Sequence, residues 1–406
     1  MMKFPSSVRF LLFFSFMTYL GKAIAFTFMA IYLTLSLKLL PKDVGLVLGL
    51  SLLFGALASL CGGHLVDRYD RKYFLWGCLF VISAAFFAIP ALSTSAGFVF
   101  VLSFANAAFA MIDITVKAMF SDFLSEDERL KAFSTRYLLA NIAFAIGPLL
   151  GSVAARLNPV IPFFVSGGVA LLLLIVAIAA QRWLRPIQTH SDLGGHPVNF
   201  SSSIEALRRD RALIFFTLGG ILSAVIYARF PTYLSLYLAT VSSEAVAYKY
   251  VAMVTTVNAV TVISLQYGAS RMIDKSNLFR FIAAGSLLFG AGLIIFSISM
   301  NLAAWAVGMF IFSLGEIIVV PSEYLAIDRI APNNLKGSYF AVQNLSNLGD
   351  ALSPILCGFI LSFAVPEMMF YFLSVLSVGC IALYWLGYRA IAAVGSGGVL
   401  PEIQTM

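Results

Sequence analysis

One charged stretch interrupts an otherwise apolar chain: Gly62-Gly63-His64-Leu65-Val66-Asp67-Arg68-Tyr69-Asp70-Arg71-Lys72. Five of its last six residues are charged, whereas the residues on either side are almost entirely apolar. Two hydrophobic runs, 43–66 and 73–91, flank the charges, and each is long enough to cross a membrane as a helix. The stretch therefore predicts a very short turn at the membrane surface between two spanning helices.

The composition agrees with a polytopic membrane protein. Hydrophobic residues make up 61% of the 406 residues and charged residues 11%, with a mean hydropathy of +0.95. Because a spanning helix needs about 20 apolar residues, we predict an all-α membrane protein with twelve transmembrane helices in two pseudo-symmetric six-helix bundles. The predicted spans are 8–37, 43–66, 73–91, 96–119, 132–156, 160–183, 211–239, 245–268, 278–298, 302–326, 337–363 and 367–388.

The net charge of +7 is distributed unevenly along the chain. If the N-terminus is cytoplasmic, most Lys and Arg residues fall at cytoplasmic helix ends, and the outer side carries only Lys38, Lys42, Arg156 and Lys249. This asymmetry follows the positive-inside rule. We therefore expect both termini in the cytoplasm, and we attribute the basic character to anionic membrane lipid rather than to a nucleic-acid partner.

Nothing in the sequence indicates a metal site or an enzyme. All four cysteines, Cys61, Cys78, Cys357 and Cys380, lie in hydrophobic runs without ligand spacing, which predicts buried free thiols. The sequence has no phosphate-binding Gly-Lys-Ser loop and no Ser/His/Asp arrangement in a polar domain. We therefore expect no enzymatic activity, no ATP-driven pumping, and no cofactor beyond a proton gradient as the energy source.

The two halves of the chain share a pattern of spacings. Asp122 precedes Pro148 by the same interval as Asp328 precedes Pro354. The predicted parts are an N-terminal six-helix bundle over 1–185, a cytoplasmic linker over 186–210, a C-terminal bundle over 211–390 and a cytoplasmic tail over 391–406. Parallel repeats of this kind place a substrate site between the halves at mid-depth.

A polar and aromatic face marks the run 8–37. Tyr19, Lys22 and Phe26 lie three and four residues apart, so they share one face of a helix. An unpaired Lys22 near mid-bilayer would cost about 2.5–3.5 kcal/mol on insertion scales, so we predict that it faces a substrate cavity or a counter-ion. The alternative is a purely structural buried pair. Asn141, in the run 132–156, joins the predicted cavity.

Two opposite charges lie four residues apart in the run 96–119. Asp113 precedes Lys117, which is the favourable orientation for an ion pair within a helix. The two residues either neutralise one another or take part in gating. We include Asp113 among the predicted proton-coupling residues.

Carboxylates in the second half are the main candidates for moving protons. Glu316 lies about 21 Å into the run 302–326 at 1.5 Å per residue, and Asp350 lies near mid-membrane in the run 337–363. Burial and a neighbouring cation shift the proton affinity of a carboxylate in opposite directions, so we predict Glu316 as the coupling site and Asp350 as the second candidate. The alternative is a static ion pair, such as Lys22 with Glu316. Further predicted cavity residues are Arg229, Tyr233, Asn258, Gln343 and Asn347.

The charged turn resembles the signature loop between helices 2 and 3 of major facilitator superfamily transporters. The matching pattern is Gly63-x-x-x-Asp67-Arg68-x-x-Arg71-Lys72. The resemblance implies that the glycine permits close helix contact, the aspartate caps and pairs, and the basic residues hold the cytoplasmic surface. It covers nearly the whole chain and implies the major facilitator fold and secondary transport.

A second motif, Gly147-Pro148-Leu149-Leu150-Gly151, resembles the Gly-Pro-x-x-Gly motif of the exporter branch of that superfamily. Proline removes a backbone hydrogen bond and the glycines admit a close neighbour, which predicts a bendable and tightly packed helix. The ordinary alternative is a kinked membrane helix without a role in export.

Segments of the second half resemble bacterial inner-membrane efflux permeases for dipeptides and sugars, near the drug:proton antiporters. The matching segments are Asn258–Tyr267, Gly315–Ile318, Glu323-Tyr324 and Asp328–Pro332. Many of those antiporters carry an arginine followed by Gln-Gly early in helix 4, and this chain has Phe104, Ala107 and Ala108 there. The role of that motif in proton relay therefore does not carry over.

These features predict a monomeric secondary transporter in the bacterial inner membrane. We expect proton-coupled efflux of small amphiphilic or zwitterionic solutes, such as dipeptides, drugs or metabolites, by alternating access. Two alternatives remain open: a proton-coupled importer of an organic anion or peptide, and a membrane receptor or scaffold that does not transport.

Overall fold

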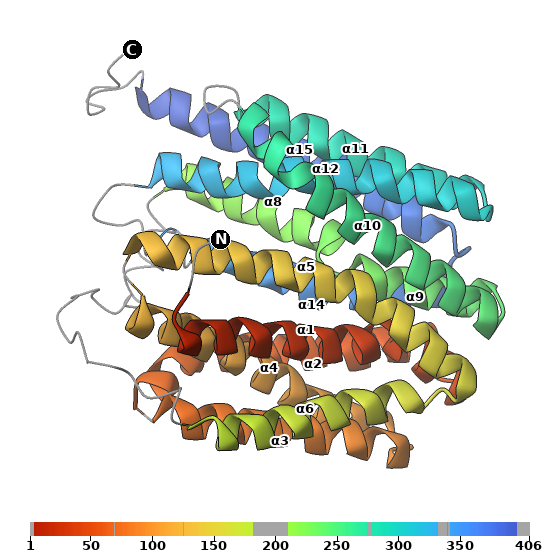
Figure 1. Ribbon diagram of the computed structural model, residues 1–406. Coiled ribbons are helices and arrows are strands. Elements are labelled where there is room, and N and C mark those ends of the chain that lie inside the picture. Colours follow the sequence, from red (N-terminus) through yellow and green to blue (C-terminus); the bar gives the residue numbers. More distant parts are fainter. Residues whose placement is uncertain are drawn as a thin grey trace. The chain divides into compact units, whose positions relative to one another are not determined.

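The computed structural model describes residues 4–68, 70–124, 126–181, 210–273, 278–331, 339 and 342–395, and every regular element in these ranges is a helix (Figure 1). The first part of the chain forms α1 (Ser6–Ile31), α2 (Pro41–Arg68), α3 (Arg71–Ala88), α4 (Ser95–Phe123), α5 (Glu126–Leu157) and α6 (Ile161–Ala179). A π-helical turn, Tyr32–Ser36, continues α1. The second part forms α8 (Arg211–Tyr227), α9 (Phe230–Val241), α10 (Glu244–Met272), α11 (Leu278–Ile298), α12 (Leu302–Ile330), α14 (Asn347–Phe363) and α15 (Met368–Gly395).

Short polar residues fix where several of these helices begin. Asp70 accepts a hydrogen bond from the Lys72 backbone N–H at the start of α3. Thr94, Asp210 and Asn301 accept equivalent bonds at the starts of α4, α8 and α12. Each bond satisfies a backbone donor that has no partner within the first helical turn. The charged stretch Gly62–Lys72 thus contains the residue that caps the start of α3.

The apolar runs predicted from the sequence form membrane-length helices. Within the described ranges, ten helical stretches are long and apolar enough to cross a membrane, and the bent pair α8–α9 brings the number to eleven. The remaining predicted span, 337–363, corresponds to α14, an apolar helix of 17 residues. Part of that predicted span, residues 337, 338, 340 and 341, lies outside the described residues.

The predicted span 211–239 is broken rather than continuous. α8 ends at Tyr227, α9 begins at Phe230, and the two helices are bent by 44°. Pro231 accounts for the break, because proline has no backbone N–H and its ring would clash with the carbonyl of Tyr227, four residues earlier. Arg229 consequently lies in the two-residue gap between the helices.

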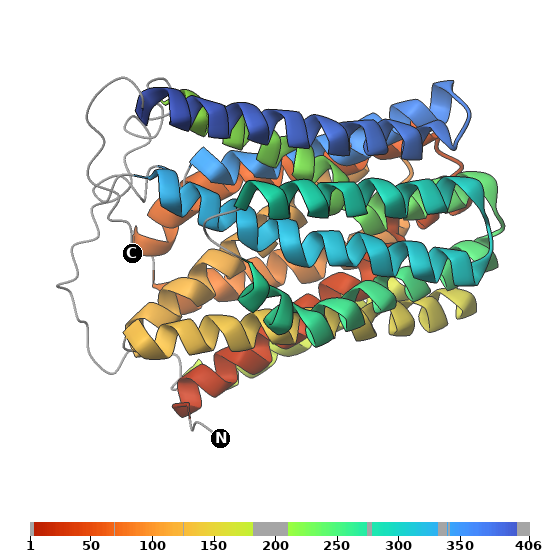
Figure 2. The same ribbon diagram turned by 90° about the horizontal axis from the view of Figure 1, so that it is seen from above.

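Contacts divide the chain into two compact units. The first contains α1 to α6, α9, most of α10 and most of α14, and the second contains α8, α11, α12, α15 and the first residues of α14. In the first unit α1 packs against α5 and α6, α2 against α4, and α3 against α6. In the second unit α11 lies between α12 and α15, and α15 also packs against α8 (Figure 2). The predicted linker and tail fall mostly outside the described residues, and the predicted boundaries of the two bundles stay a prediction.

Two glycines of α5 let this helix approach α1 closely. A Cβ atom on Gly147 would lie 2.5 Å from Ala23 Cβ, and one on Gly151 would lie 2.6 Å from Ile24 O and from the Phe28 ring. Pro148 lies between them inside α5. The Gly-Pro motif therefore occupies a tight helix crossing in the first unit, while its role in export stays a prediction.

Candidate functional site

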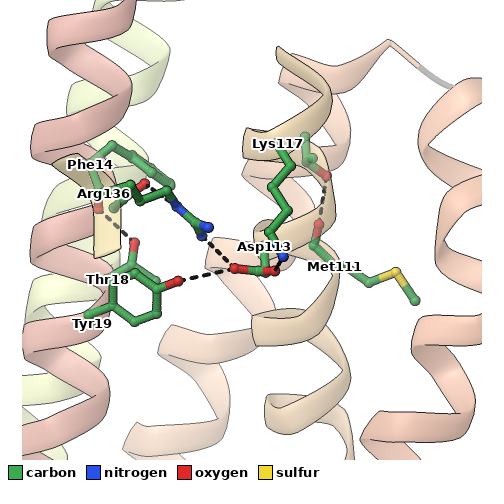
Figure 3. Close-up of polar contacts among 9 residues, drawn as sticks. Phe14, Thr18, Tyr19, Met111, Asp113, Lys117 and Arg136 are labelled. Carbon is green, nitrogen blue, oxygen red and sulfur yellow. Dashed lines mark hydrogen bonds and ion pairs between the residues drawn. The ribbon is translucent and has the colours of Figure 1, made fainter. Parts of the chain in front are cut away.

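A carboxylate and two cations meet inside the first unit. Asp113 Oδ1 accepts hydrogen bonds from Arg136 Nη2 at 2.5 Å and from Tyr19 Oη at 3.1 Å, and Asp113 Oδ2 lies 2.6 Å from Lys117 Nζ. Figure 3 shows the Asp113 side chain between Tyr19 and Arg136 on one side and Lys117 on the other. We call these four residues, Tyr19, Asp113, Lys117 and Arg136, the Asp113 cluster.

Three helices build the Asp113 cluster. Asp113 and Lys117 are one helical turn apart on α4, so the ion pair that their spacing predicts is present. Tyr19 comes from α1 and Arg136 from α5, and both hydrogen bonds to Asp113 cross between helices. Hydrogen bonds to charged partners are stronger than neutral ones, so this carboxylate joins three membrane helices at one point.

Arg136 is the member of the cluster that the sequence reasoning missed. Its side chain is 8% exposed, its Nε donates to Ser15 Oγ at 3.2 Å, and its guanidinium lies 5.2 Å from the centre of the Tyr19 ring. The one signal in the sequence was an arginine near the start of the apolar run 132–156. A charge within a spanning run is costly and therefore marks a functional or paired position.

The cluster carries more positive than negative charge. Asp113 contributes one negative charge when ionised, while Lys117 and Arg136 contribute one positive charge each. The Lys117 side chain is 53% exposed, whereas that of Arg136 is 8% exposed. The lysine can therefore move toward a ligand while the arginine stays fixed among the three helices.

Lys22 lies against aromatic rings in the first unit. Its Nζ is 4.9 Å from the centre of the Phe109 ring and 5.8 Å from that of Phe26, distances at which an ammonium is attracted by a ring face. Lys22 also lines a cavity of about 10 Å³ together with Thr18 and Ser166. That volume holds about one water molecule, so the cavity around the predicted substrate residue has no room for a solute in this structure.

In the second unit, the helix break presents Arg229 to a carboxylate. Arg229 Nη2 lies 3.2 Å from Asp350 Oδ2, at the start of α14. Arg229 Nε is buried and has no hydrogen-bond partner among the described residues. The structure thus pairs a predicted cavity residue with a predicted coupling residue.

The other predicted residues take varied positions. Tyr233 is fully buried, Asn141 donates to Tyr137 O within its own helix, and Asn347 is exposed at the start of α14. Glu316 and Asn258 are half-buried on α12 and α10. Gln343 Oε1 is buried and has no hydrogen-bond partner within the described ranges. The predicted roles of these residues stay predictions.

The basic residues of the charged turn hold the start of α3. Arg71 Nη1 donates to Ala118 O on α4 at 3.0 Å, and Lys72 Nζ lies 3.1 Å from Asp70 Oδ2. The side chains of Asp67 and Arg68 and the surroundings of Gly63 lie outside the described residues. Arg71 therefore connects the turn to the C-terminal part of α4, at the residue that follows Lys117.

Three of the predicted free thiols are present as such. Cys78, Cys357 and Cys380 are buried free cysteines, and the Cys61 side chain lies outside the described part of the chain. Among the described residues, no three His, Cys, Asp or Glu side chains gather as a metal site would require.

Known proteins match this chain over most of its length. The family model of the Major Facilitator Superfamily matches residues 11–347. The chain is 31% identical over 373 residues to the MFS-type transporter YdeE of Escherichia coli (strain K12), covering 91% of this chain and 93% of that protein. It is 25% identical over 339 residues to a Na(+), Li(+), K(+)/H(+) antiporter of Planococcus maritimus, covering 77% of this chain and 80% of that one.

Solved structures share the fold at lower identity. A bacterial homologue of the human lysosomal transporter Spinster has a TM-score of 0.79 at 13% identity, covering 95% of this chain and 97% of its own. A mutant of the nucleoside transporter NupG also has a TM-score of 0.79, at 11% identity, covering 94% of this chain and all of its own. Because the family model matches most of this chain, the chain belongs to the major facilitator superfamily and is a multi-pass secondary transporter, not an enzyme.

Proposed function

We propose that this transporter exports small zwitterionic or amphiphilic solutes, such as dipeptides, drugs or metabolites, in exchange for protons. It acts in the bacterial inner membrane with both termini in the cytoplasm. The observation that carries the proposal is the Asp113 carboxylate, held between Arg136, Lys117 and Tyr19 within membrane-spanning helices. Charges at such depth are costly, which favours a role in moving charge or solute.

The exposed lysine indicates how a zwitterion would bind. Lys117 Nζ, 2.6 Å from Asp113 Oδ2, marks the place that an ammonium group takes at this carboxylate. The ammonium of a substrate would displace Lys117, and the released lysine would then bind the carboxylate of the same substrate. Arg136 would keep the Asp113 carboxylate in place during the exchange, because its guanidinium is also held by Ser15.

Competition for one carboxylate would couple the two flows. A proton on Asp113 removes the charge that an ammonium group needs, so proton and substrate bind in turn and not together. Alternate binding of this kind, at a site open to each side in turn, yields antiport. One relative of the chain is a cation/proton antiporter, which supports proton antiport by analogy.

The Arg229–Asp350 pair supports a second point of coupling. A proton on Asp350 would weaken the ion pair that ties the α8–α9 break to the start of α14. Movement at a helix break requires few backbone hydrogen bonds to change, so the pair is suited to control it. Glu316 remains the further proposed coupling residue on α12.

A second candidate function follows from the net charge of the Asp113 cluster. With Asp113 protonated, Lys117 and Arg136 would both be available to an anionic group, so a proton and an organic anion would bind together. That order of binding gives symport, and hence import of an organic anion or peptide.

The test uses inside-out membrane vesicles energised to hold a pH gradient. Dipeptides, cationic drugs, organic anions and sugars are added in turn, and dissipation of the gradient is recorded for the wild type, Asp113→Asn and the control Asp43→Asn. We expect dissipation by a zwitterionic or cationic solute in the wild type and the control, and none in Asp113→Asn. Dissipation unchanged in Asp113→Asn would contradict the coupling role of Asp113.

A complementary assay separates export from import. Intact cells that hold an inward proton gradient are given a labelled dipeptide and a labelled organic anion. We expect neither to accumulate above the level of cells without the transporter. Proton-dependent accumulation of either compound would replace the export proposal with the import candidate.

A further inference from the structure

A buried carboxylate in α12 stands outside the transport chemistry proposed above. Glu323 is 6% exposed and lies in the second unit, on α12, which packs against α11 and also contacts α8. Tyr384 Oη donates a hydrogen bond of 2.6 Å to Glu323 Oε1. The Ser223 hydroxyl, which donates to Cys380 Sγ at 3.8 Å, lies beside the carboxyl group. The carboxyl is therefore anchored by the neutral Tyr384 hydroxyl of a neighbouring helix.

The groups that face Glu323 include no cation among the described residues. They are Tyr227 on α8, Tyr324 on α12, and Cys380 and Tyr384 on α15. Glu316 and Asp350 act in turn on Tyr227. Each of these is neutral or negatively charged at neutral pH, and Arg229 is engaged with Asp350. A buried ion without an opposite charge is costly by several kcal/mol, whereas a carboxyl group that carries a proton avoids most of this cost.

The cavity beside the carboxyl group offers an acceptor for that proton. Glu323, Gln343, Tyr384 and Thr217 line one cavity of about 10 Å³, which has room for about one water molecule. Gln343 Oε1 is buried and has no hydrogen-bond partner in the described part of the chain. An amide oxygen can only accept hydrogen bonds, so it lacks a donor, and a protonated Glu323 supplies one directly or through a single water.

We propose that Glu323, Tyr384, Ser223 and Gln343 form a proton-binding site. The carboxyl group accepts the hydrogen bond from Tyr384 and carries the proton on Oε2, the oxygen that Tyr384 does not contact. This proton points toward Gln343 Oε1. The use of the site in coupling rests on the proposed antiport, but proton binding itself does not.

The test measures the proton directly, without transport. Purified full-length protein in lipid nanodiscs is labelled with ¹³C-glutamate, and its infrared spectrum is recorded as the pH of the buffer is varied, in H₂O and in D₂O. A protonated carboxyl group gives a C=O band that is separate from the carboxylate bands and shifts in D₂O. We expect such a band in the wild type and in Glu367→Gln, and we expect Glu323→Gln to lose it.

A second variant keeps the test decisive if Glu323→Gln folds poorly. Tyr384→Phe retains the acid but removes one hydrogen bond from it, so the C=O band should move to higher frequency. A band that persists in Glu323→Gln, or that does not move in Tyr384→Phe, would overturn the assignment. So would the absence of any protonated glutamate band from the wild type. If the band behaves as expected while the vesicles show no proton movement, the proton site stands and the proposed antiport fails.

Discussion

Arg229 Nη2 lies 3.2 Å from Asp350 Oδ2, and the arginine occupies the gap where a membrane-spanning segment is broken into α8 and α9. The side chains are 29% and 23% exposed, so the pair is only partly shielded. The bend thus carries a charge whose counter-ion belongs to another helix. Proline forces the helix to end at Tyr227, so helical backbone hydrogen bonds do not fix the position of Arg229. The ion pair with Asp350 holds it instead.

Asp350→Asn should reduce both transport and stability. The substitution removes a charge-assisted hydrogen bond, which contributes roughly 1.5–3 kcal/mol, so we expect a lower unfolding temperature and a loss of transport of about tenfold or more. Unfolding is followed with a dye that reacts with the buried thiols Cys78, Cys357 and Cys380 as they become accessible. Asp43→Asn, a charge loss in the first turn of α2, serves as the control.

Exchange of the two charges tests whether the pair itself matters. The double variant Arg229→Asp/Asp350→Arg should recover part of the stability that each single variant loses, since the opposite charges meet again. Recovery of stability without transport would assign the pair a structural role. No recovery of either property would contradict the importance of the ion pair.

Arg136→Lys should destabilise the first unit more than Lys117→Gln. A lysine is a single point charge and cannot contact Asp113, Ser15 and the Tyr19 ring together as the planar guanidinium does. We expect a loss of about 1.5–3 kcal/mol for Arg136→Lys and at most about 1 kcal/mol for Lys117→Gln, whose side chain is 53% exposed. Equal shifts in the thiol-dye unfolding temperature would contradict the central position of Arg136.

The helices could be predicted from the sequence because the bilayer allows few backbone structures. Apolar runs of membrane length can only form helices or closed barrels there, and the described spans follow the predicted runs closely. The break at Arg229 was missed because the two helices together are apolar enough for one span, and Pro231 acts through the backbone and not through polarity. α14 begins at Asn347, directly after a 3-10 turn over Asn344–Ser346, and part of the predicted run before that turn lies outside the described residues.

The candidate site was only partly visible in the sequence. Asp113 and Lys117 could be paired because they share one helix, where a spacing of four brings side chains together. Arg136 lies on another helix and resembles a flanking charge near the start of its run, so only the packing of the helices reveals its contact with Asp113. Glu323 was visible in the sequence only as part of a segment that resembles efflux permeases, and the resemblance does not reveal that Tyr384, on another helix, hydrogen-bonds to it.

Glu316→Gln should change the pH dependence of transport. If Glu316 binds and releases the coupled proton, the variant should bind substrate but no longer respond to the pH gradient. The measurement compares substrate-induced gradient dissipation in vesicles with equilibrium substrate exchange, which needs no net proton movement. We expect exchange to be retained and dissipation to be lost. An unchanged pH profile would exclude Glu316 from coupling and leave Asp113, Asp350 and Glu323 as the candidates.

Gly151→Ala and Gly168→Ala should have opposite effects on stability. At Gly151 the added methyl group would press against Ile24 O and the Phe28 ring of α1, whereas at Gly168 no atom lies within 4 Å of the added Cβ. Overpacking costs about 1–3 kcal/mol, while replacing glycine by alanine inside a helix gains roughly 0.5–1 kcal/mol. We therefore expect a lower unfolding temperature for Gly151→Ala and an unchanged or higher one for Gly168→Ala. If export requires α5 to pack this closely on α1, Gly151→Ala should also lose transport, and full transport with a lowered unfolding temperature would restrict the motif to a structural role.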